Sequence, residues 1–410
     1  MSRETDRATA LEALREGKTP ENGALLRDIT AGTDSLTDFL MRIYLEDYIP
    51  SGGSKIKFVT GNAGSGKTHF SQLMCREAEK RNYRTVRFSA KDIWLNDFRE
   101  IYLEIIRQCD LEEILKGCAE KMIRDMGYAP ADIREGQNFM DMLSERGEGD
   151  ALTRNEIRGQ LRTWFTRNPL LDNTFAACCS LLTGGILGHP VLEKANADLI
   201  LAYMRGDKTV KAAQLKAIGL VPSPITKMNA RHLLRSLCEV IHLSGSGGLM
   251  VIIDDMEMLL NRNTADPIRY TKLRREDTYE SIRQLIDDID SMRYVLFMMC
   301  FDRELMDDES LGMKSYQALW FRIQNEVVSS RFNRFADILD MDRYGDEAYD
   351  AETLCEMSKK LASVMREAGI PASPLDREEA ENLRARSVFG RLGLPYLMNR
   401  MTLEGGREHE

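Results

Sequence analysis

One eight-residue segment constrains this chain more than any other feature of its sequence. Residues 61–68 read Gly-Asn-Ala-Gly-Ser-Gly-Lys-Thr and fit the pattern GxxxxGK[ST] of a P-loop. A short β-rich run at residues 55–60 precedes the loop, and helical sequence at residues 69–80 follows it. A chance glycine turn before Lys-Thr is the alternative, and the correct flanks on both sides argue against it. The segment therefore predicts a strand, a phosphate-binding loop and a helix in that order.

The chemistry of the loop predicts ATP and Mg²⁺ as ligands. Its glycines let successive N–H groups point at phosphates, and the new helix adds its positive end. Lys67 would neutralise the β- and γ-phosphates, and the Thr68 hydroxyl would be a Mg²⁺ ligand. We expect nine residues to contact the nucleotide: Gly61, Asn62, Ala63, Gly64, Ser65, Gly66, Lys67, Thr68 and His69.

Around the loop, short strands alternate with helices. Residues 83–89 form a second predicted strand, and residues 248–254 and 294–301 are apolar runs that suit buried strands. A strand, a helix and a second strand make a βαβ unit, which implies a parallel sheet. The sequence therefore predicts an α/β fold with an AAA+-like P-loop NTPase core, a large helical insertion and a C-terminal helical lid.

About 150 residues with almost no strand character separate the second and third predicted strands, which is too long for a loop. The division of the chain follows from this gap. We predict an N-terminal helical segment, a first core part, a helical insertion, a second core part and a helical lid, at residues 1–50, 51–93, 94–243, 244–345 and 346–410.

The third predicted strand ends in acidic residues. Parallel strands deliver their last side chains to the edge where a P-loop also lies. We predict that Asp254 holds Mg²⁺ through water and that Asp255 orients or deprotonates the attacking water, with Glu257 as its rival. A strand that merely ends in an acidic turn is the alternative.

Three further side chains are candidates for the reaction. Asp302 follows the fourth predicted strand, where AAA+ ATPases place a polar residue near the γ-phosphate, although an ordinary strand-end turn reads the same. Arg331 follows an amphipathic helix and is the first candidate for an arginine that a neighbouring subunit supplies; Arg334 and then Arg322 come next. We expect Phe332 and Phe335 to bury against the core. A surface ion-pairing arginine is the plain alternative.

The composition of the chain limits the kinds of molecule that it is expected to bind. The net charge of −9 argues against a surface coated with basic residues, but a local patch at Arg269, Lys272, Arg274, Arg275 and Arg283 would suit DNA. Interleaved acidic residues make a solvated helix face the default there.

The eight cysteines show no metal spacing and predict reduced core thiols. With no signal peptide or membrane span in the sequence, we expect a cytoplasmic protein.

Several strings of sequence resemble the ATP-binding proteins of BREX-type phage-defence loci, the BrxD type. They lie at residues 7–17, 32–34, 52–68, 279–287 and 316–319. The resemblance implies an AAA+-like ATPase akin to origin-recognition and Cdc6-type proteins, working in anti-phage defence with partner proteins and DNA. No appended winged-helix domain is expected. The second acidic position, where such motors commonly have Glu, is Asp255.

The function predicted is that of an ATP hydrolase whose nucleotide drives assembly or a conformational switch, as a homo-oligomer or with defence partners. A second hypothesis is a nucleotide-dependent scaffold with negligible hydrolysis, which Asp255 favours. A third is a small-molecule kinase that uses the same loop, against which the long insertion argues.

Overall fold

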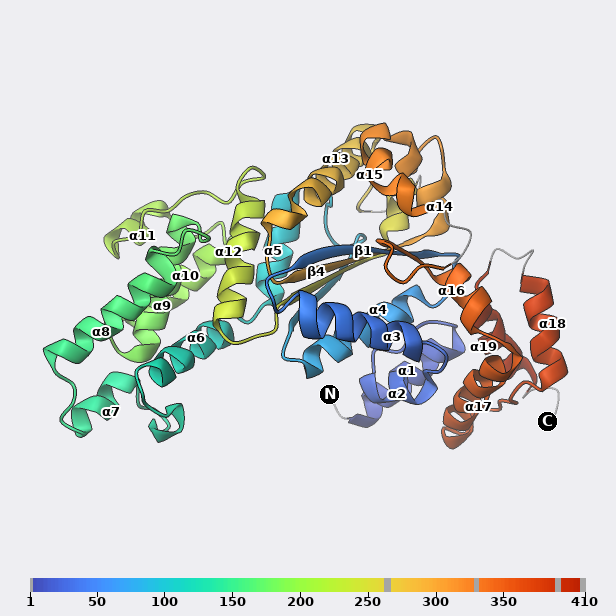
Figure 1. The fold of residues 1–410 in the computed structure, drawn as a ribbon, viewed down its shortest axis with the longest axis horizontal. Helices are drawn as coiled ribbons and strands as arrows, with labels where there is room; N and C mark the ends of the chain where they lie inside the picture. Colours follow the sequence, from blue (N-terminus) through green and yellow to red (C-terminus); the bar gives the residue numbers. More distant parts are fainter. Residues whose placement is uncertain (1–2, 262–266, 328–331, 388–391, 406–410) are drawn as a thin grey trace.

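The computed structural model describes residues 3–261, 267–327, 332–387 and 392–405. Within them, one sheet of five parallel strands lies at the centre of the molecule (Figure 1). The strands are β1 (Ser54–Gly61), β2 (Arg84–Ser89), β3 (Leu249–Asp254), β4 (Val295–Asp302) and β5 (Ile338–Asp340), in the spatial order β2-β3-β4-β1-β5. The predicted α/β fold with a parallel P-loop core is confirmed. Strand β5 is absent from the prediction because three residues show no readable alternation.

The sheet has an apolar core on each face, because alternate side chains of a strand point to opposite sides. Val251 and Phe297 belong to one core, and their neighbours Ile252 and Met298 belong to the other. All six side chains of β3 are buried. The continuous apolar runs of β3 and β4 therefore reflect a sheet that helices cover on both sides.

Different parts of the chain supply the two helical layers (Figure 1). One face carries α1 (Arg3–Arg15), α3 (Asp34–Leu40), the π-helix η1 (Met41–Tyr48) and α4 (Lys67–Lys80). The other face carries α5 (Phe98–Gln108), α12 (Ala230–Leu243), α13 (Lys272–Asp288) and α15 (Gln317–Val327). Shorter 3₁₀ turns join other elements: η2 (Pro130–Asp132), η4 (Met256–Leu260), η5 (Ile289–Ser291) and η6 (Met313–Ser315).

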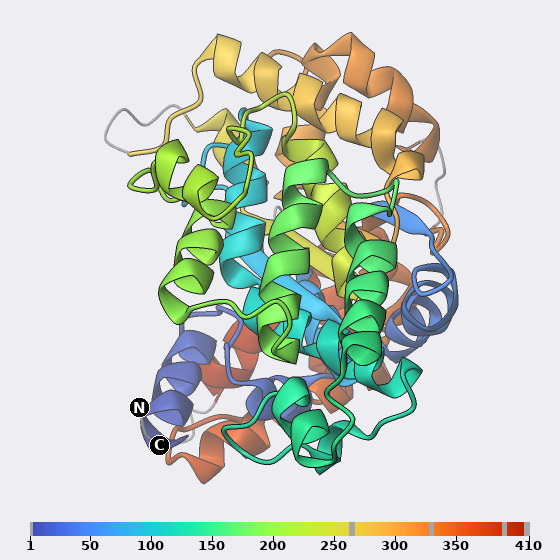
Figure 2. The ribbon, with the colours of Figure 1, turned by 90° about the vertical axis from the view of Figure 1, so that its left-hand side faces the viewer.

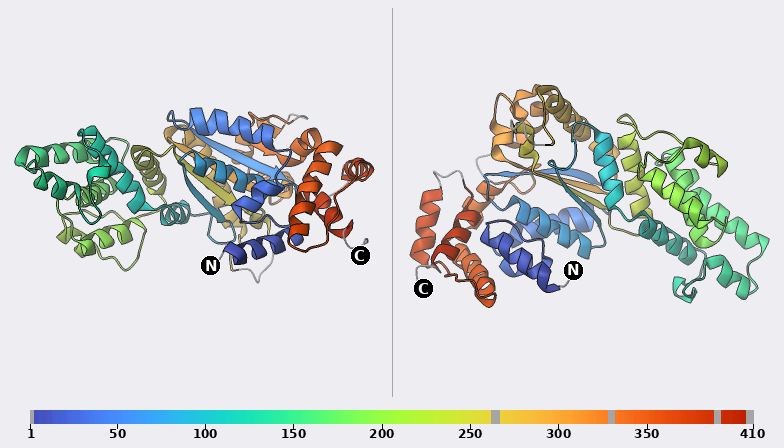
Figure 3. Two further views of the ribbon diagram at one scale, coloured as in Figure 1. Left: turned by 90° about the horizontal axis from the view of Figure 1, so that it is seen from below. Right: turned by 180° about the vertical axis from the view of Figure 1, so that it is seen from behind.

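Between β2 and β3 the described chain consists of helices and connecting loops, without a strand. Helices α5 and α12 lie beside the sheet, and the helices between them project away from it (Figures 1 and 3). Figure 2 looks onto this projection, which hides much of the sheet. Its elements are α6 (Leu111–Asp125), α7 (Phe139–Glu145), α8 (Ala151–Leu161), the π-helix η3 (Arg162–Thr166), α9 (Asn173–Leu187), α10 (Lys194–Met204) and α11 (Ala212–Ala217). Their buried side chains continue the core that covers one face of the sheet.

The C-terminal helices lie at the opposite end of the molecule from the projection (Figure 1). They follow the short α14 (Arg303–Asp307) and comprise α16 (Met341–Ala348), α17 (Ala351–Glu367), α18 (Arg377–Ser387) and α19 (Leu394–Gly405). Helix α17 packs against α18, α19 and the N-terminal helix α2 (Gly23–Ile29). An N-terminal helix and the C-terminal helices therefore pack against each other.

Two simpler expectations are met by the described residues. None of the described helices is long and apolar enough to cross a membrane. All eight cysteines are free thiols, and most are buried. Burial raises the pKa of Cys109 and Cys118 to about 12, so these thiols stay protonated and unreactive at neutral pH.

Candidate functional site

The P-loop joins β1 to α4 and wraps as the sequence predicts. Gly64 and Gly66 have φ values of 76° and 92°, in the left-handed region that glycine tolerates. A Cβ on Gly64 would also lie 2.4 Å from the Cβ of Tyr396, so packing excludes any larger residue. Gly66 is the N-cap of α4, which directs the positive end of the helix into the loop. The segment has the geometry of an anion site.

Lys67 is folded back onto the loop and the neighbouring strand. Its Nζ contacts Asp302 Oδ1 at 2.7 Å and donates to the carbonyls of Asn62 at 2.9 Å and Gly61 at 3.1 Å. The contact with Asp302 follows from the strand register, in which Gly61 of β1 pairs with Asp302 of β4. The side chain is only 10% exposed, so its charge is held by three acceptors at the mouth of the loop.

Glu257 lies beside this pair. It sits on the 3₁₀ turn η4, and its Oε2 accepts a hydrogen bond from the Asp302 N–H at 3.3 Å. Burial, with a further contribution from the charge of Asp302, raises the pKa of Glu257 to about 7. A carboxyl with that pKa can gain or lose a proton near neutral pH.

Asp254 is the last residue of β3, at the carboxyl edge of the sheet. It is 6% exposed, and Arg87 of β2 donates to its Oδ2 at 3.2 Å. Burial raises the pKa of the Cys300 thiol on β4; Asp254 adds to that rise, and Lys67 opposes it. The charges of Asp254 and Lys67 thus act on the same thiol in opposite directions, and the role of Asp254 as a Mg²⁺ ligand stays a prediction.

Asp255 turns in the opposite direction. Its φ of 56° places the backbone in the left-handed region, and its carboxylate accepts from Ser89 Oγ at 2.6 Å and Lys91 Nζ at 2.7 Å. Burial opposes ionisation of Asp255, but the hydrogen bonds from Lys91 and Ser89 outweigh it and lower the pKa. Both partners lie at the end of β2, so Asp255 faces away from the P-loop strand.

A cavity of about 400 Å³ opens beside the P-loop. It is enclosed by the N-terminal segment, the start of α4 and the C-terminal helices; Thr30, Thr68 and Tyr396 each lie on one of these walls. Its volume falls in the range of small-molecule pockets. Much of this wall comes from residues between 14 and 33 and from the C-terminal helices; it lies outside the P-loop motif and was not predicted as part of the site.

His69 lines this cavity and has a fixed tautomer. Its Nε2 lies 2.8 Å from Thr30 Oγ1, and the Thr30 hydroxyl donates to the Leu26 carbonyl at 2.6 Å. Because a hydroxyl has one proton, Oγ1 must accept from Nε2–H, which leaves the lone pair on Nδ1. Burial lowers the pKa of His69 to about 4, so the ring is neutral at pH 7. Among the described residues Nδ1 has no hydrogen-bond partner.

The start of α19 packs directly on the P-loop. The Gly393 N–H donates to the Ala63 carbonyl at 2.9 Å, and the Tyr396 N–H donates to the Gly64 carbonyl at 3.2 Å. A Cβ on Gly393 would lie 2.3 Å from the Ser65 Cα, so the two backbones touch. The C-terminal helices are therefore coupled to the loop through backbone contacts.

A second polar network holds the P-loop from the β5 side. The Asn62 N–H donates to Asp342 Oδ2 at 2.8 Å. Arg303, which follows Asp302, forms ion pairs with both Asp340 and Asp342. Asp340 and Asp342 were not predicted because they lie at or just after the end of β5, which has no readable strand pattern. The aspartates at either end of Asp-Met-Asp, just after an apolar pair, were the available signal.

The family described as BREX system ATP-binding protein BrxC/D matches residues 3–403. The chain belongs to this family. The match includes the helical insertion, to which the resemblance found in the sequence hardly extended. Among curated proteins and among solved structures, nothing matches the chain. The P-loop of this BrxC/D-family protein is the part of its structure that fits the ATP binding named in the family's description.

The candidate arginine fingers of this BrxC/D-family protein differ in where they lie in the structure. Arg331 lies outside the described residues. Arg334 is exposed, with its guanidinium 5.5 Å from the Phe39 ring centroid. The prediction that both phenylalanines bury against the core is wrong for Phe335, which is 64% exposed although its ring makes an edge-to-face contact with the Phe39 ring; Phe332 is half-buried.

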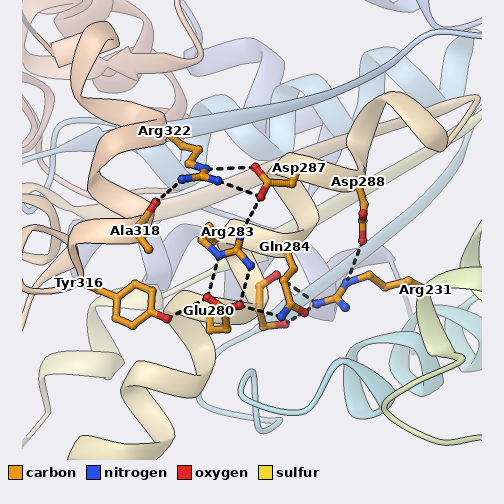
Figure 4. Close-up of polar contacts among 10 residues, drawn as sticks. Arg231, Glu280, Arg283, Gln284, Asp287, Asp288, Tyr316, Ala318 and Arg322 are labelled. Atoms are coloured by element: carbon orange, nitrogen blue, oxygen red, sulfur yellow. Dashed lines mark hydrogen bonds and ion pairs between the residues drawn. The ribbon is translucent and has the colours of Figure 1, made fainter.

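Arg322 and Arg283 are held in a network of carboxylates between α13 and α15 (Figure 4). Arg283 pairs with Glu280 at 2.6 Å and also with Asp287. Arg322 donates to both oxygens of Asp287, at 3.1 and 3.2 Å. The hydrogen bond from Arg283 lowers the pKa of Glu280 to about 2, which keeps the network charged. Neither arginine is available to a phosphate in this arrangement.

The other residues of the predicted basic patch also lie in different environments. Arg275 is buried and donates to two backbone carbonyls. Arg274 stacks over the Trp94 ring at 4.0 Å. Arg269 is exposed, and Lys272 is exposed and forms an ion pair with Glu276 at 3.9 Å. The five residues therefore do not form one basic surface.

Proposed function

We propose that this BrxC/D-family protein binds and hydrolyses MgATP, and that it is of the BrxD type with an AAA+ core akin to origin-recognition proteins. The observation that supports this most is the 2.7 Å contact of Lys67 with Asp302, between the P-loop and the adjacent strand. A P-loop lysine neutralises the β- and γ-phosphates, so an incoming triphosphate would take Lys67 from Asp302. Asp302 would then lie next to the γ-phosphate, in the predicted position.

The residues present fit a magnesium ion. Thr68 and Asp254 offer a hydroxyl and a buried carboxylate, and Mg²⁺ prefers one or two such oxygen ligands with phosphate and water. When bound, the ion would neutralise charge on the β- and γ-phosphates. Asp254 would meanwhile keep its orientation through the hydrogen bond from Arg87.

Glu257 is our first candidate for the residue that orients and deprotonates the attacking water, ahead of Asp255. Glu257 contacts the backbone of Asp302, next to Lys67, whereas Asp255 is bound to Lys91 at the far strand. A base is most effective when its pKa is near the working pH, and the pKa of Glu257 is about 7.

Nucleotide binding would be read by the C-terminal helices. Because Ala63 and Gly64 bind the start of α19 through their carbonyls, a triphosphate that reshapes the loop would shift that helix. We propose that this movement is the switch, in a homo-oligomer or with defence partners, in the cytoplasm and on DNA. Arg331, or else Arg334, would act on the neighbouring subunit's nucleotide.

Two assays test this function. Steady-state phosphate release, with and without DNA, should be measurable for the wild type and lost in Lys67→Ala. Mixing Arg331→Ala with Lys67→Ala should restore part of the activity, because one protein has an intact site and the other an intact finger. Activity that is independent of concentration, without recovery on mixing, would contradict the arginine's role in trans.

A nucleotide-dependent scaffold is the second candidate. The ion pair of Asp255 with Lys91 favours it, because the acidic residue next to Asp254 is then unavailable to water. ATP binding without phosphate release under any condition would support the scaffold over the hydrolase.

A further inference from the structure

Helix α8 and its π-helical continuation η3 carry a row of arginines. Arg154, Arg158 and Arg162 are spaced by four residues, which places them on one side of the helix. All three are exposed. At a rise of 1.5 Å per residue they are about 6 Å apart, so the row is about 12 Å long.

These arginines differ from those of Figure 4 because they have no ion pair among the described residues. Arg158 donates only to the neutral Asn155, at 3.4 Å. Arg154 lies near Asp150 and helps to lower its pKa, behind the hydrogen bond from Thr153, but Asp150 caps the helix and binds backbone N–H groups. The row therefore presents positive charge that nothing within the described protein pairs with at contact distance.

Acidic residues are nearly absent from this helix. Glu156 is the one acid in α8 and η3. It lies two positions from both Arg154 and Arg158, so it points to the other side of the helix. The field of the row also reaches the α9–α10 connection, where burial lowers the pKa of His189 and the two arginines lower it further.

The other face of the helix is already used. Ile157, Leu161 and Phe165 are spaced by four residues and fully or almost fully buried, so they fix α8 to the projection. A helix that lies in a membrane surface needs a free apolar face. Helix α8 has none, which argues against a lipid partner and leaves the arginine row fixed on a rigid support.

We propose that Arg154, Arg158 and Arg162 bind the phosphate backbone of nucleic acid without reading its sequence. Guanidinium groups suit phosphates through their planar donors, and contacts to phosphates orient a protein on DNA without specifying sequence. One charge per helical turn matches a partner whose negative charges repeat regularly along a polymer. The row lies on the projection, far from the P-loop (Figure 1), so it acts as a contact separate from the nucleotide site.

The test compares two triple variants of the full-length protein that lose equal charge. The first is Arg154→Gln with Arg158→Gln and Arg162→Gln. The control is Arg124→Gln with Arg377→Gln and Arg400→Gln, whose arginines are exposed but each pair with a glutamate four residues away. Binding of a labelled 30-base-pair DNA duplex is followed by fluorescence anisotropy without nucleotide, over a series of salt concentrations.

We expect the row variant to bind DNA roughly tenfold or more weakly, and the slope of log K against log salt to fall by about 2–3, as three lost phosphate contacts require. The control should keep the wild-type slope. Equal losses in both variants would show that only net charge matters and would overturn the proposal. So would a wild type that does not bind DNA, or DNA that polyglutamate displaces as well as unlabelled DNA does.

Lys67→Ala separates this proposal from the proposed ATPase. It should bind DNA as the wild type does, because no described contact links α8 to the P-loop. DNA binding that is lost together with nucleotide binding would assign the effect to the ATP site and overturn the role of the row.

Discussion

Each side of the carboxyl end of β3 carries one acidic side chain, and the two side chains have opposite environments. Towards β2, Asp255 is bound by Lys91 and Ser89, and its pKa is lowered. Towards β4, Glu257 accepts a hydrogen bond from the Asp302 N–H at 3.3 Å, and burial raises its pKa to about 7. The first carboxylate is satisfied within the protein, whereas the second is kept poorly solvated beside the P-loop.

This difference shows that the pKa of a carboxylate at this position depends more on the groups that the neighbouring strand places beside it than on the position of the residue in a motif. Strand β3 lies between β2 and β4, and of these two neighbours it is β4 that is adjacent to the P-loop strand. The left-handed backbone at Asp255 sends that residue to one side and the following 3₁₀ turn, with Glu257, to the other. A reactive group is expected on the side with fewer internal partners.

The largest expected effect comes from removing the lysine on the β4 side. Lys67→Ala should weaken ATP binding roughly 100-fold, because charge-assisted hydrogen bonds to phosphate each contribute about 1.5–3 kcal/mol. Lys91→Ala, on the β2 side, is the matched control and should leave affinity nearly unchanged. Titration with a fluorescent ATP analogue measures both. Similar affinity losses in the two variants would remove the distinction between the sides.

The second comparison is between the two acids. Glu257→Gln should lower turnover roughly 100-fold while ATP stays bound, as expected when a general base is lost. Asp255→Asn should cost much less, because its carboxylate is engaged with Lys91. Phosphate release at saturating ATP decides between them. A greater loss in Asp255→Asn would restore the assignment that the sequence suggested first.

Asp254→Asn provides a third point on the same strand end. We expect it to reduce the dependence of ATP binding and turnover on Mg²⁺ concentration, because a carboxylate ligand is replaced by a neutral amide. The measurement is a Mg²⁺ titration at fixed ATP. An unchanged Mg²⁺ dependence would place the ion's protein ligands elsewhere.

The raised pKa of Glu257 also has a consequence for stability. Between the usual value of 4.5 and about 7, the folded protein holds a proton on Glu257 that the unfolded chain releases. The free energy of unfolding therefore falls as pH rises through this window, by up to about 3 kcal/mol, and stays lowered above it. The gain in thermal midpoint of Glu257→Gln over the wild type, without nucleotide, should grow from pH 5 to pH 8. A gain that does not change with pH would contradict the shift.

Sequence alone predicted the elements whose patterns are local. The loop at residues 61–68 has fixed spacing, and β3 and β4 are continuous apolar runs bounded by turns. Strand β5 has three residues, so no periodicity could reveal it, and Asp340 and Asp342 were missed with it. The burial of Phe335 was also predicted wrongly, because an aromatic residue after an amphipathic helix does not specify which neighbour covers it.

The direction in which a side chain points also could not be predicted from the sequence. Asp254, Asp255 and Glu257 were all readable as acids after a strand, but their partners come from β2 and β4, some 165 and 45 residues away in the chain. The same holds for Arg322 on α15, whose partner Asp287 lies on α13. Distant pairings of this kind leave no spacing in one sequence.

The smallest expected effect concerns His69, which borders the cavity on the P-loop side. Its Nε2–H is committed to Thr30, so Nδ1 would accept a hydrogen bond from a ribose hydroxyl or from the adenine amino group. His69→Phe keeps a ring but removes the acceptor, and should weaken ATP binding about threefold to tenfold. Thr30→Val is the control for loss of the internal bond alone. Because burial lowers the pKa of His69 to about 4, its protonation should change ATP affinity only below about pH 5.

Inosine and 2′-deoxyadenosine triphosphates identify the donor, since each changes one of the two groups. The analogue that the wild type binds less tightly than ATP, and that His69→Phe does not distinguish from ATP, carries the hydrogen bond. Equal discrimination by both proteins would mean that His69 does not contact the nucleoside.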